Sequence, residues 1–192
     1  MKKTRITNCR NGFSILEVLI AAVITAIIAA SGFQFYTKMH GQSETQDNVS
    51  EMQQLARSSL YDMRKSLLQA GFKLSGHIPY KIAGDTLAVY YSVTLPVDTI
   101  QYYLAEFTPA EYANVANQPS GTKLYNLVKK VNSGTADIFA DFITDINYNQ
   151  IDAANIVITI NVQASRSDDD YALNGGFRIY SISERINVRN VG

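Results

Sequence analysis

The feature that most constrains this chain is an uncharged, mostly apolar run of 20 residues from Val18 to Thr37. A helix that rises ~1.5 Å per residue needs about 20 apolar residues to cross the hydrocarbon core of a membrane. Basic side chains and no acidic ones precede the run within residues 1–12, and such charges favour the cytoplasmic side. The sequence therefore predicts a single membrane-spanning helix, with residues 1–12 in the cytoplasm and the rest of the chain across the membrane.

Three fates of this segment are consistent with the residues. A secretory signal would be cut after Ala29-Ala30-Ser31, and a signal anchor would remain uncut. Cleavage between Gly12 and Phe13 would instead remove only the basic leader. The single cysteine, Cys9, precedes the apolar run, which argues against a lipoprotein.

Glu17 is the acidic residue that borders this apolar run. A carboxylate costs roughly 2.5–3.5 kcal/mol at the centre of a membrane helix, and less near an interface. An interfacial acid in the first turns of a helix, favoured by the helix dipole, is one explanation. Cleavage after Gly12 supplies another, because the free or methylated amine of Phe13 on a neighbouring chain would pair with Glu17 and set the stagger between packed helices.

The stretch Gly12-Phe13-Ser14-Ile15-Leu16-Glu17, placed between a basic leader and the apolar run, resembles the processing site of type IV prepilins and type II secretion pseudopilins. The resemblance implies that a prepilin peptidase cuts after Gly12 and methylates Phe13, and that Glu17 acts in assembly. Close packing of such helices needs small side chains. The residues that would permit it are Ala21, Ala22, Ala26, Ala29 and Ala30.

The residues after the apolar run predict a second, amphipathic half of the helix, followed by β-strands. Apolar residues recur at three- and four-residue steps from Val49 to Ala70, which predicts an amphipathic helix that ends at Gly71. A two-residue period then indicates half-buried strands. The strands are expected within residues 86–93, 100–105, 123–130, 142–148, 156–163 and 177–187, the last with a bulge near Ser181.

We therefore predict an α+β fold in which one long helix packs on an antiparallel β-sheet. The expected segments are a leader (1–12), a membrane and assembly half of the helix (13–38), an amphipathic half (39–72) and a globular sheet domain (73–192). A bend or local melting is expected at 41–48 in an assembled state.

Within the pilin-like group, the chain is most similar to PilW-type minor pilins and J-type pseudopilins. The similarity rests on Arg57–Phe72, Asp85–Tyr91, Phe142–Tyr148 and Ile186–Asn190. Gln34 stands where many major pilins carry a proline, and paired carboxyl-terminal cysteines are missing. Both departures favour a minor subunit over a major one.

Little in the sequence indicates catalysis or a bound cofactor. The two histidines, His40 and His77, do not suffice for a multi-histidine metal site, and no phosphate-binding loop or nucleophile elbow occurs. Outside residues 1–12 acidic side chains outnumber basic ones, which argues against direct binding of nucleic acid. The run Asp168-Asp169-Asp170 is a weak candidate for calcium, since its spacing does not fit the EF-hand pattern and a solvated acidic hairpin tip explains it well.

The sequence predicts a structural subunit and not an enzyme. The expected partners are other pilin or pseudopilin subunits, a prepilin peptidase and an inner-membrane assembly platform. The protein would be held in the inner membrane by one pass, then join a filament or its initiating tip complex. A major filament subunit and a signal-anchored periplasmic binding or sensing domain are the alternatives.

Overall fold

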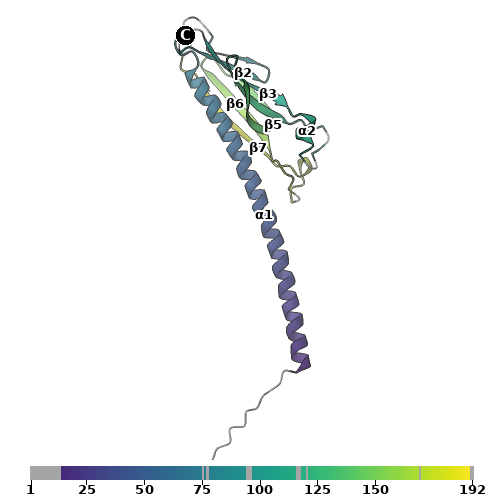
Figure 1. The fold of residues 1–192 in the computed structure, drawn as a ribbon. Helices are drawn as coiled ribbons and strands as arrows, with labels where there is room; N and C mark the ends of the chain where they lie inside the picture. The colour runs from purple at the N-terminus through teal and green to yellow at the C-terminus, as the bar shows by residue number, and fades with distance from the viewer. Residues whose placement is uncertain are drawn as a thin grey trace, which may run out of the picture. The chain divides into compact units, whose positions relative to one another are not determined.

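The computed structural model describes residues 14–74, 76, 78–93, 97–115, 118–119, 121–168 and 170–190. The chain divides into two compact units, Met1–Glu44 and Thr45–Gly192, and a long helix, α1 (Ile15–Gln69), contributes to both (Figure 1). The predicted single long helix is confirmed.

In the first unit, the described part of α1 leaves every residue exposed. Its most apolar window has a mean hydropathy of 2.3 and none of it is buried. Thr25 and Ser31, the hydroxyl residues of its central turns, donate to the backbone carbonyls of Ala21 and Ile27 at 2.7 and 2.9 Å. Because their donors are satisfied within the helix, these hydroxyls do not oppose burial in lipid. By length and composition, the helix is able to cross a membrane.

In the second unit, seven strands form one antiparallel sheet in chain order (Figure 1). The strands are β1 (Tyr80–Ala83), β2 (Thr86–Tyr91), β3 (Asp98–Glu106), β4 (Tyr125–Val131), β5 (Ala136–Gln150), β6 (Asn155–Gln163) and β7 (Ile179–Asn187). Two short helices, α2 (Pro109–Tyr112) and η1 (Asn174–Gly176), lie in the connections. The predicted α+β class is confirmed.

The sheet curls so strongly that distant strands meet. The Tyr80 hydroxyl of β1 lies 3.3 Å from the Ala153 carbonyl oxygen in the β5–β6 turn, although β2, β3 and β4 separate these elements in the sheet. Next to that turn, the Val188 amide donates to the Ala154 carbonyl at 2.6 Å. The chain after β7 is thereby tied to the same end of the sheet.

The main core lies between the apolar face of α1 and one face of the sheet. On α1 the buried apolar residues are Met52, Ala56, Leu60, Met63 and Leu67, and the buried Ala70 follows directly after the helix, as the periodicity predicts. They pack against alternate strand residues that include Leu87, Val89, Tyr102, Leu127, Ile158 and Ile160. A smaller core of Phe107, Val115, Leu124 and Phe177 lies apart from it. Packing of the helical half on the sheet thus accounts for most of the buried apolar surface in the described residues.

Gly71 ends the helix at the position that the sequence predicts. Its φ of 75° lies in the left-handed region, which glycine adopts readily. Its amide donates to the Tyr90 carbonyl at 2.8 Å, and the Asn190 side chain donates to the Ala70 carbonyl at 3.0 Å. The end of the helix is therefore held by β2 and by the carboxyl-terminal segment.

The predicted bulge near Ser181 is wrong. β7 pairs with β6 without a shift from Ile179 to Asn187. The change of apolar phase arises because Phe177 precedes the strand and belongs to the smaller core. The irregularities lie in β5 instead, where the register shifts against both β4 and β6 and Phe142 has a φ of 53°.

Candidate assembly surface

Ser14 begins α1 by accepting hydrogen bonds from the first turn. The Leu16 amide donates to its Oγ at 3.3 Å, and the Glu17 and Val18 amides donate to its carbonyl oxygen at 3.0 and 3.2 Å. These contacts satisfy backbone donors that every helix leaves free at its start. The helix therefore starts within the short motif that the sequence singles out.

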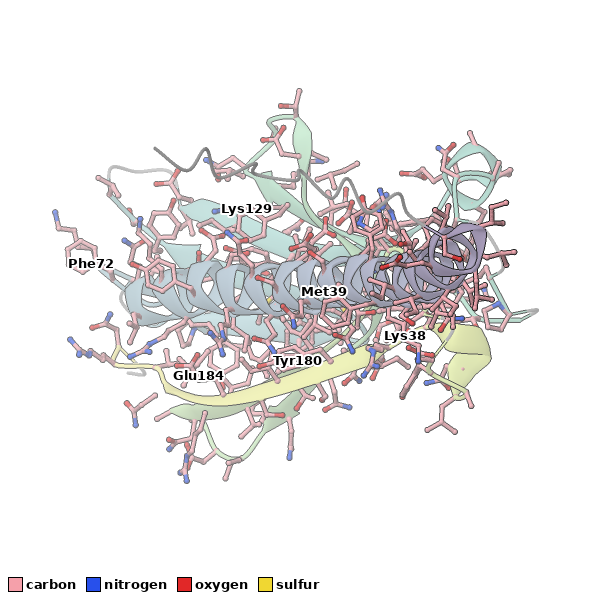
Figure 2. All side chains as sticks on the ribbon, turned by 90° about the horizontal axis from the view of Figure 1, so that it is seen from below. Lys38, Met39, Phe72, Lys129, Tyr180 and Glu184 are labelled. Atoms are coloured by element: carbon pink, nitrogen blue, oxygen red, sulfur yellow. The ribbon has the colours of Figure 1, made fainter. Side chains whose placement is uncertain are left out.

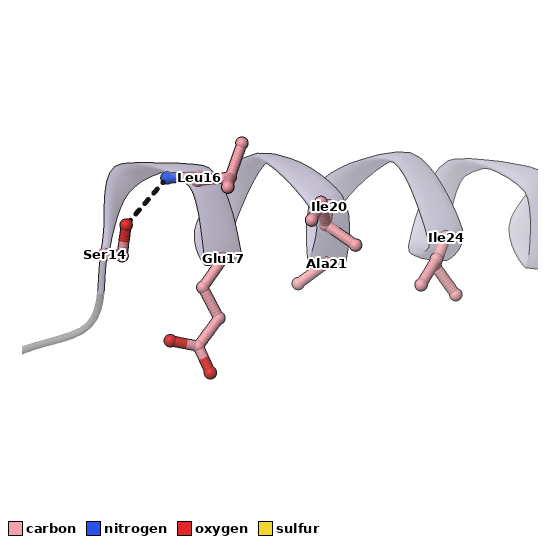
Figure 3. A pocket seen from close by; sticks show the side chains of 6 residues that line it. All are labelled: Ser14, Leu16, Glu17, Ile20, Ala21 and Ile24. Atoms are coloured by element: carbon pink, nitrogen blue, oxygen red, sulfur yellow. Dashed lines mark hydrogen bonds between the residues drawn. The ribbon is translucent and has the colours of Figure 1, made fainter.

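Glu17 projects from the first turns of α1 into a shallow, mostly apolar hollow lined also by Ile20, Ala21 and Ile24 (Figure 3). It is the acidic residue of the first turn of α1. Within the described residues its carboxylate has no hydrogen bond or ion pair. An uncompensated carboxylate among apolar side chains is costly in lipid, so a cation from another chain would be favoured beside it.

The predicted packing alanines lie on two sides of the helix. Ala26 lies four residues after Ala22, and Ala29 and Ala30 lie three and four residues after Ala26, which places these four alanines in one stripe. Ala21 is four residues from Glu17 and lies beside it (Figure 3). All are exposed. The described helix thus presents a small-residue stripe and, on a different side, an acidic position.

The cleavage pair Gly12 and Phe13 and the leader 1–12 lie outside the described residues, as do Cys9 and His77. Their predicted roles rest on the sequence. His40 lies in α1, where it is exposed and 3.7 Å from Glu44.

The acidic run that was a weak calcium candidate is only partly described, since Asp169 lies outside the described residues. The Asp168 carboxylate accepts from Arg178 Nε at 2.8 Å and from the Asp170 amide at 3.0 Å. The hydrogen bond from Arg178 lowers the pKa of Asp168. No group of three potential metal-binding side chains occurs in the described parts of the chain. The Asp168 side chain therefore holds its loop in place through these two hydrogen bonds.

Sequence reasoning missed a polar cluster between helix and sheet. Asp62 lies beside the apolar face of α1, where its Oδ2 accepts from Lys129 Nζ at 2.7 Å and from the Tyr102 hydroxyl at 2.5 Å. The same hydroxyl shares a hydrogen bond of 2.8 Å with Ser66 Oγ. Burial and the hydrogen bond to Asp62 raise the pKa of Tyr102, so the phenol stays protonated as a donor. The four-residue spacing of Asp62 and Ser66 beside the apolar face is the signal for this cluster.

A second ion pair flanks α1 on its other side. Arg64 Nη1 lies 2.8 Å from Glu184 Oε1 of β7, and Figure 2 shows Lys129 and Glu184 on opposite sides of the helix. The helical half is thus fixed to the sheet by polar contacts along both margins of its apolar face.

Comparison with known families identifies the amino-terminal segment. Residues 7–33 match the prokaryotic N-terminal methylation motif. No curated protein and no solved structure matches the chain significantly. The matched residues contain the start of α1 and Glu17, so the motif and the apolar helix describe one segment. The motif and the apolar helix of the described residues support a precursor of the type IV pilin and pseudopilin kind and are consistent with membrane anchoring, which points to a structural subunit.

Proposed function

We propose that this protein is a minor pilin or pseudopilin of the PilW or J type. A prepilin peptidase cuts the leader 1–12 after Gly12 and methylates Phe13. The processed chain then leaves the inner membrane to join a filament, in its initiating tip complex. Residues 13–38 serve as the membrane and assembly half of the helix, 39–72 as its amphipathic half and 73–192 as the exported sheet domain.

The observation that carries the proposal is the coincidence of three features in one segment. The methylation motif covers residues 7–33, an exposed apolar helix starts at Ile15, and Glu17 has no partner in the described chain. Packing of apolar helices through Ala21 and the Ala22, Ala26, Ala29 and Ala30 stripe would bring chains together. The amine of a neighbour's Phe13, with an ordinary pKa near ~8, would be charged and would neutralise Glu17. Gln34 and the single Cys9 favour the minor over the major subunit.

Intact mass and amino-terminal sequencing of the protein from native membranes test the processing step. A chain that starts at Phe13 and is heavier by one methyl group is expected. A chain that starts at Met1 would instead be a signal-anchored domain, and one that starts at Gly32 a secreted domain. Either result contradicts the proposal.

Glu17→Ala tests the assembly step. The variant should insert and be cut normally, yet yield fewer filaments, because the neighbour's amine loses its partner. Glu44→Ala is the matched control, since Glu44 is an exposed acid on the same helix, 55% exposed in its side chain. Normal filament numbers with Glu17→Ala would rule out the pairing.

A further inference from the structure

The last strand of the sheet, β7, has β6 as its only neighbour among the described strands. The Ala164 amide, just beyond β6, donates to the Arg178 carbonyl at 2.8 Å. At the other end of the pair, the Val188 amide donates to the Ala154 carbonyl at 2.6 Å. Because successive residues of an antiparallel strand face the partner and face away in turn, the even-numbered residues of β7 bond to β6. The odd-numbered residues direct their backbone groups outward.

The outer edge of β7 therefore carries five amides and five carbonyls that have no backbone partner in the described chain. The residues are Ile179, Ser181, Ser183, Arg185 and Asn187, and all of them are exposed. The pairing of β7 with β6 is regular over the nine residues of the strand. A long, regular edge of this kind is a template for a further strand.

The opposite edge of the sheet is protected in ways that β7 is not. β1 has only four residues, begins directly after Pro79, and lies against the β5–β6 turn through the Tyr80 hydroxyl. β7 contains no proline, glycine or lysine. Its inward-facing acid, Glu184, is neutralised by Arg64 at 2.8 Å. Short strands, prolines and unpaired charges are the usual protection of a sheet edge, so the edge of β7 is suited to binding.

The side of β7 that faces α1 is incompletely covered. Tyr180 and Ile182 are only partly buried against the main core, whereas Ile186 is 2% exposed. A strand added beside β7 would place alternate side chains about 5 Å from Tyr180 and Ile182. Its other side chains would lie beside the exposed hydroxyl of Ser183 and beside Arg185, which makes no ion pair with any described residue.

We propose that β7 accepts an extended segment of a different protein as an eighth, antiparallel strand of the sheet. About nine residues would pair, the length of β7. Apolar side chains would cover Tyr180 and Ile182, and polar ones would alternate with them. An acidic residue is expected opposite Arg185, because opposite charges across a strand pair attract. Main-chain hydrogen bonds supply the affinity of such a contact, and the alternating side chains supply its specificity.

A second copy of this chain is disfavoured as the occupant, and this step rests on the proposed function. Subunits of one filament share a direction along its axis, so the β7 strands of two copies would meet in parallel, which is the less stable pairing. In an antiparallel sheet of seven strands in chain order, the first and last strands run the same way. β1 of a neighbour would therefore also pair in parallel, over four residues at most.

Photo-cross-linking in native membranes tests strand addition. Full-length chains carry p-benzoylphenylalanine in place of Ile179, Ser181 or Ser183, one site in each chain. Asn147 is the matched control, since it is exposed in the same cross-strand row as Ser183 but lies on β5, away from the edge. We expect adducts with one other protein from the three β7 sites and not from Asn147. Equal adducts from Asn147, adducts with a second copy, or no adduct overturn the proposal.

The positions of the cross-links distinguish strand addition from other contacts. In an antiparallel pair, a probe that moves two residues forward meets the partner two residues earlier. The adducts from Ile179, Ser181 and Ser183 should therefore map to three positions of one segment, in reverse order and about two residues apart. Cross-links scattered over several segments of the partner overturn the proposal.

Proline substitution tests the backbone of the edge. Ser183→Pro removes an outward amide and no bond to β6, and proline is tolerated on an edge strand when its nitrogen faces solvent. The adduct from position 181 should fall about two- to tenfold, as expected for one lost hydrogen bond. Ser183→Ala, which keeps the amide, should leave the yield unchanged, and thermal unfolding should show both variants folded. Equal yields from the two folded variants contradict the proposal, and the cross-link positions test it without either variant.

The amino-terminal mass of the same samples separates this inference from the proposed function. If the chains start at Phe13 but the β7 sites give no adduct, the docking edge is wrong and the proposed function stands. If they start at Met1 while the adducts map in reverse order to one segment, the proposed function fails and β7 is the docking edge of a signal-anchored protein.

Discussion

At the scale of single residues, Gly71 is the most tightly constrained of the described glycines. It combines a positive φ of 75° with close approach to Asn190, whose backbone oxygen a Cβ at position 71 would strike. Gly84 also has a positive φ, of 56°, but open space around it. Substitutions at these two glycines therefore distinguish the cost of backbone strain from the cost of a steric clash.

Gly71→Ala should therefore lower the free energy of unfolding by more than about 2 kcal/mol, the strain and the collision acting together. Gly84→Ala should cost only about 1 kcal/mol, from strain alone. Thermal or urea unfolding of the detergent-solubilised full chain measures both. Equal losses would show that Asn190 moves aside.

Asp141 of β5 is a partly buried carboxyl group. Burial raises its pKa, with Glu51 and Glu111 adding to the effect. Because the folded pKa lies above that of the unfolded chain, the folded state binds more protons between the two values. The contribution of Asp141 to stability is thus most favourable at low pH and declines as pH rises through this window.

Asp141→Asn should remove that decline and raise the melting temperature at pH 7. Unfolding measured from about pH 4 to 7 gives the profile, and Asp137→Asn, at an exposed position of the same strand, controls for loss of a charge. A variant with a melting temperature below that of the natural protein at pH 7 would mean that Asp141 is stabilised by its contacts.

At the scale of elements, the helical half of α1 illustrates what periodicity can predict. The repeat of apolar residues identified the buried face, since most of its members are buried and the other two, Val49 and Leu55, are partly buried. Ser59 and Ser66 are also buried. Periodicity did not reveal them, because an apolar repeat does not indicate whether a small hydroxyl residue is buried or exposed. Their hydroxyls are satisfied by the Leu55 carbonyl at 2.8 Å and by Tyr102.

Leu60 and Tyr61 provide an adjacent pair on opposite sides of this helix, 2% and 69% exposed. Leu60→Ala should destabilise the protein by about 2–5 kcal/mol, because it opens a cavity against the sheet. Tyr61→Ala should change stability by about 0.5 kcal/mol or less. Urea unfolding measures both, and a comparable loss at the two positions would contradict the assignment of faces.

At the scale of the whole molecule, the exposed apolar residues of the two units differ in their setting. Apolar residues of the first unit are exposed because the helix has no protein around it there; Ile24 is 52% exposed. Ile78 of the second unit is even more exposed, at 72%. Of these two residues, only Ile24 lies in a segment that is apolar enough to enter lipid.

Ile24→Arg should therefore reduce insertion, because an arginine near the middle of a membrane helix costs roughly 2.5–3.5 kcal/mol. Ile78→Arg should leave insertion unchanged. Alkaline extraction of membranes, followed by quantification of the pellet and the supernatant, distinguishes them. Equal extraction of both variants would show that residues 15–44 do not anchor the protein.

The sequence by itself determined the helix, its membrane-crossing length, its stop at Gly71, the processing motif and most strands, because each depends on local spacing or composition. Only the tertiary structure decided the short β1 strand, the irregularities of β5 and the cluster of Asp62, Tyr102 and Lys129. These features depend on how strands pair and on how the helix packs against the sheet. That packing brings residues 67 positions apart, such as Asp62 and Lys129, within 2.7 Å, and a local sequence pattern carries no information about so distant a contact.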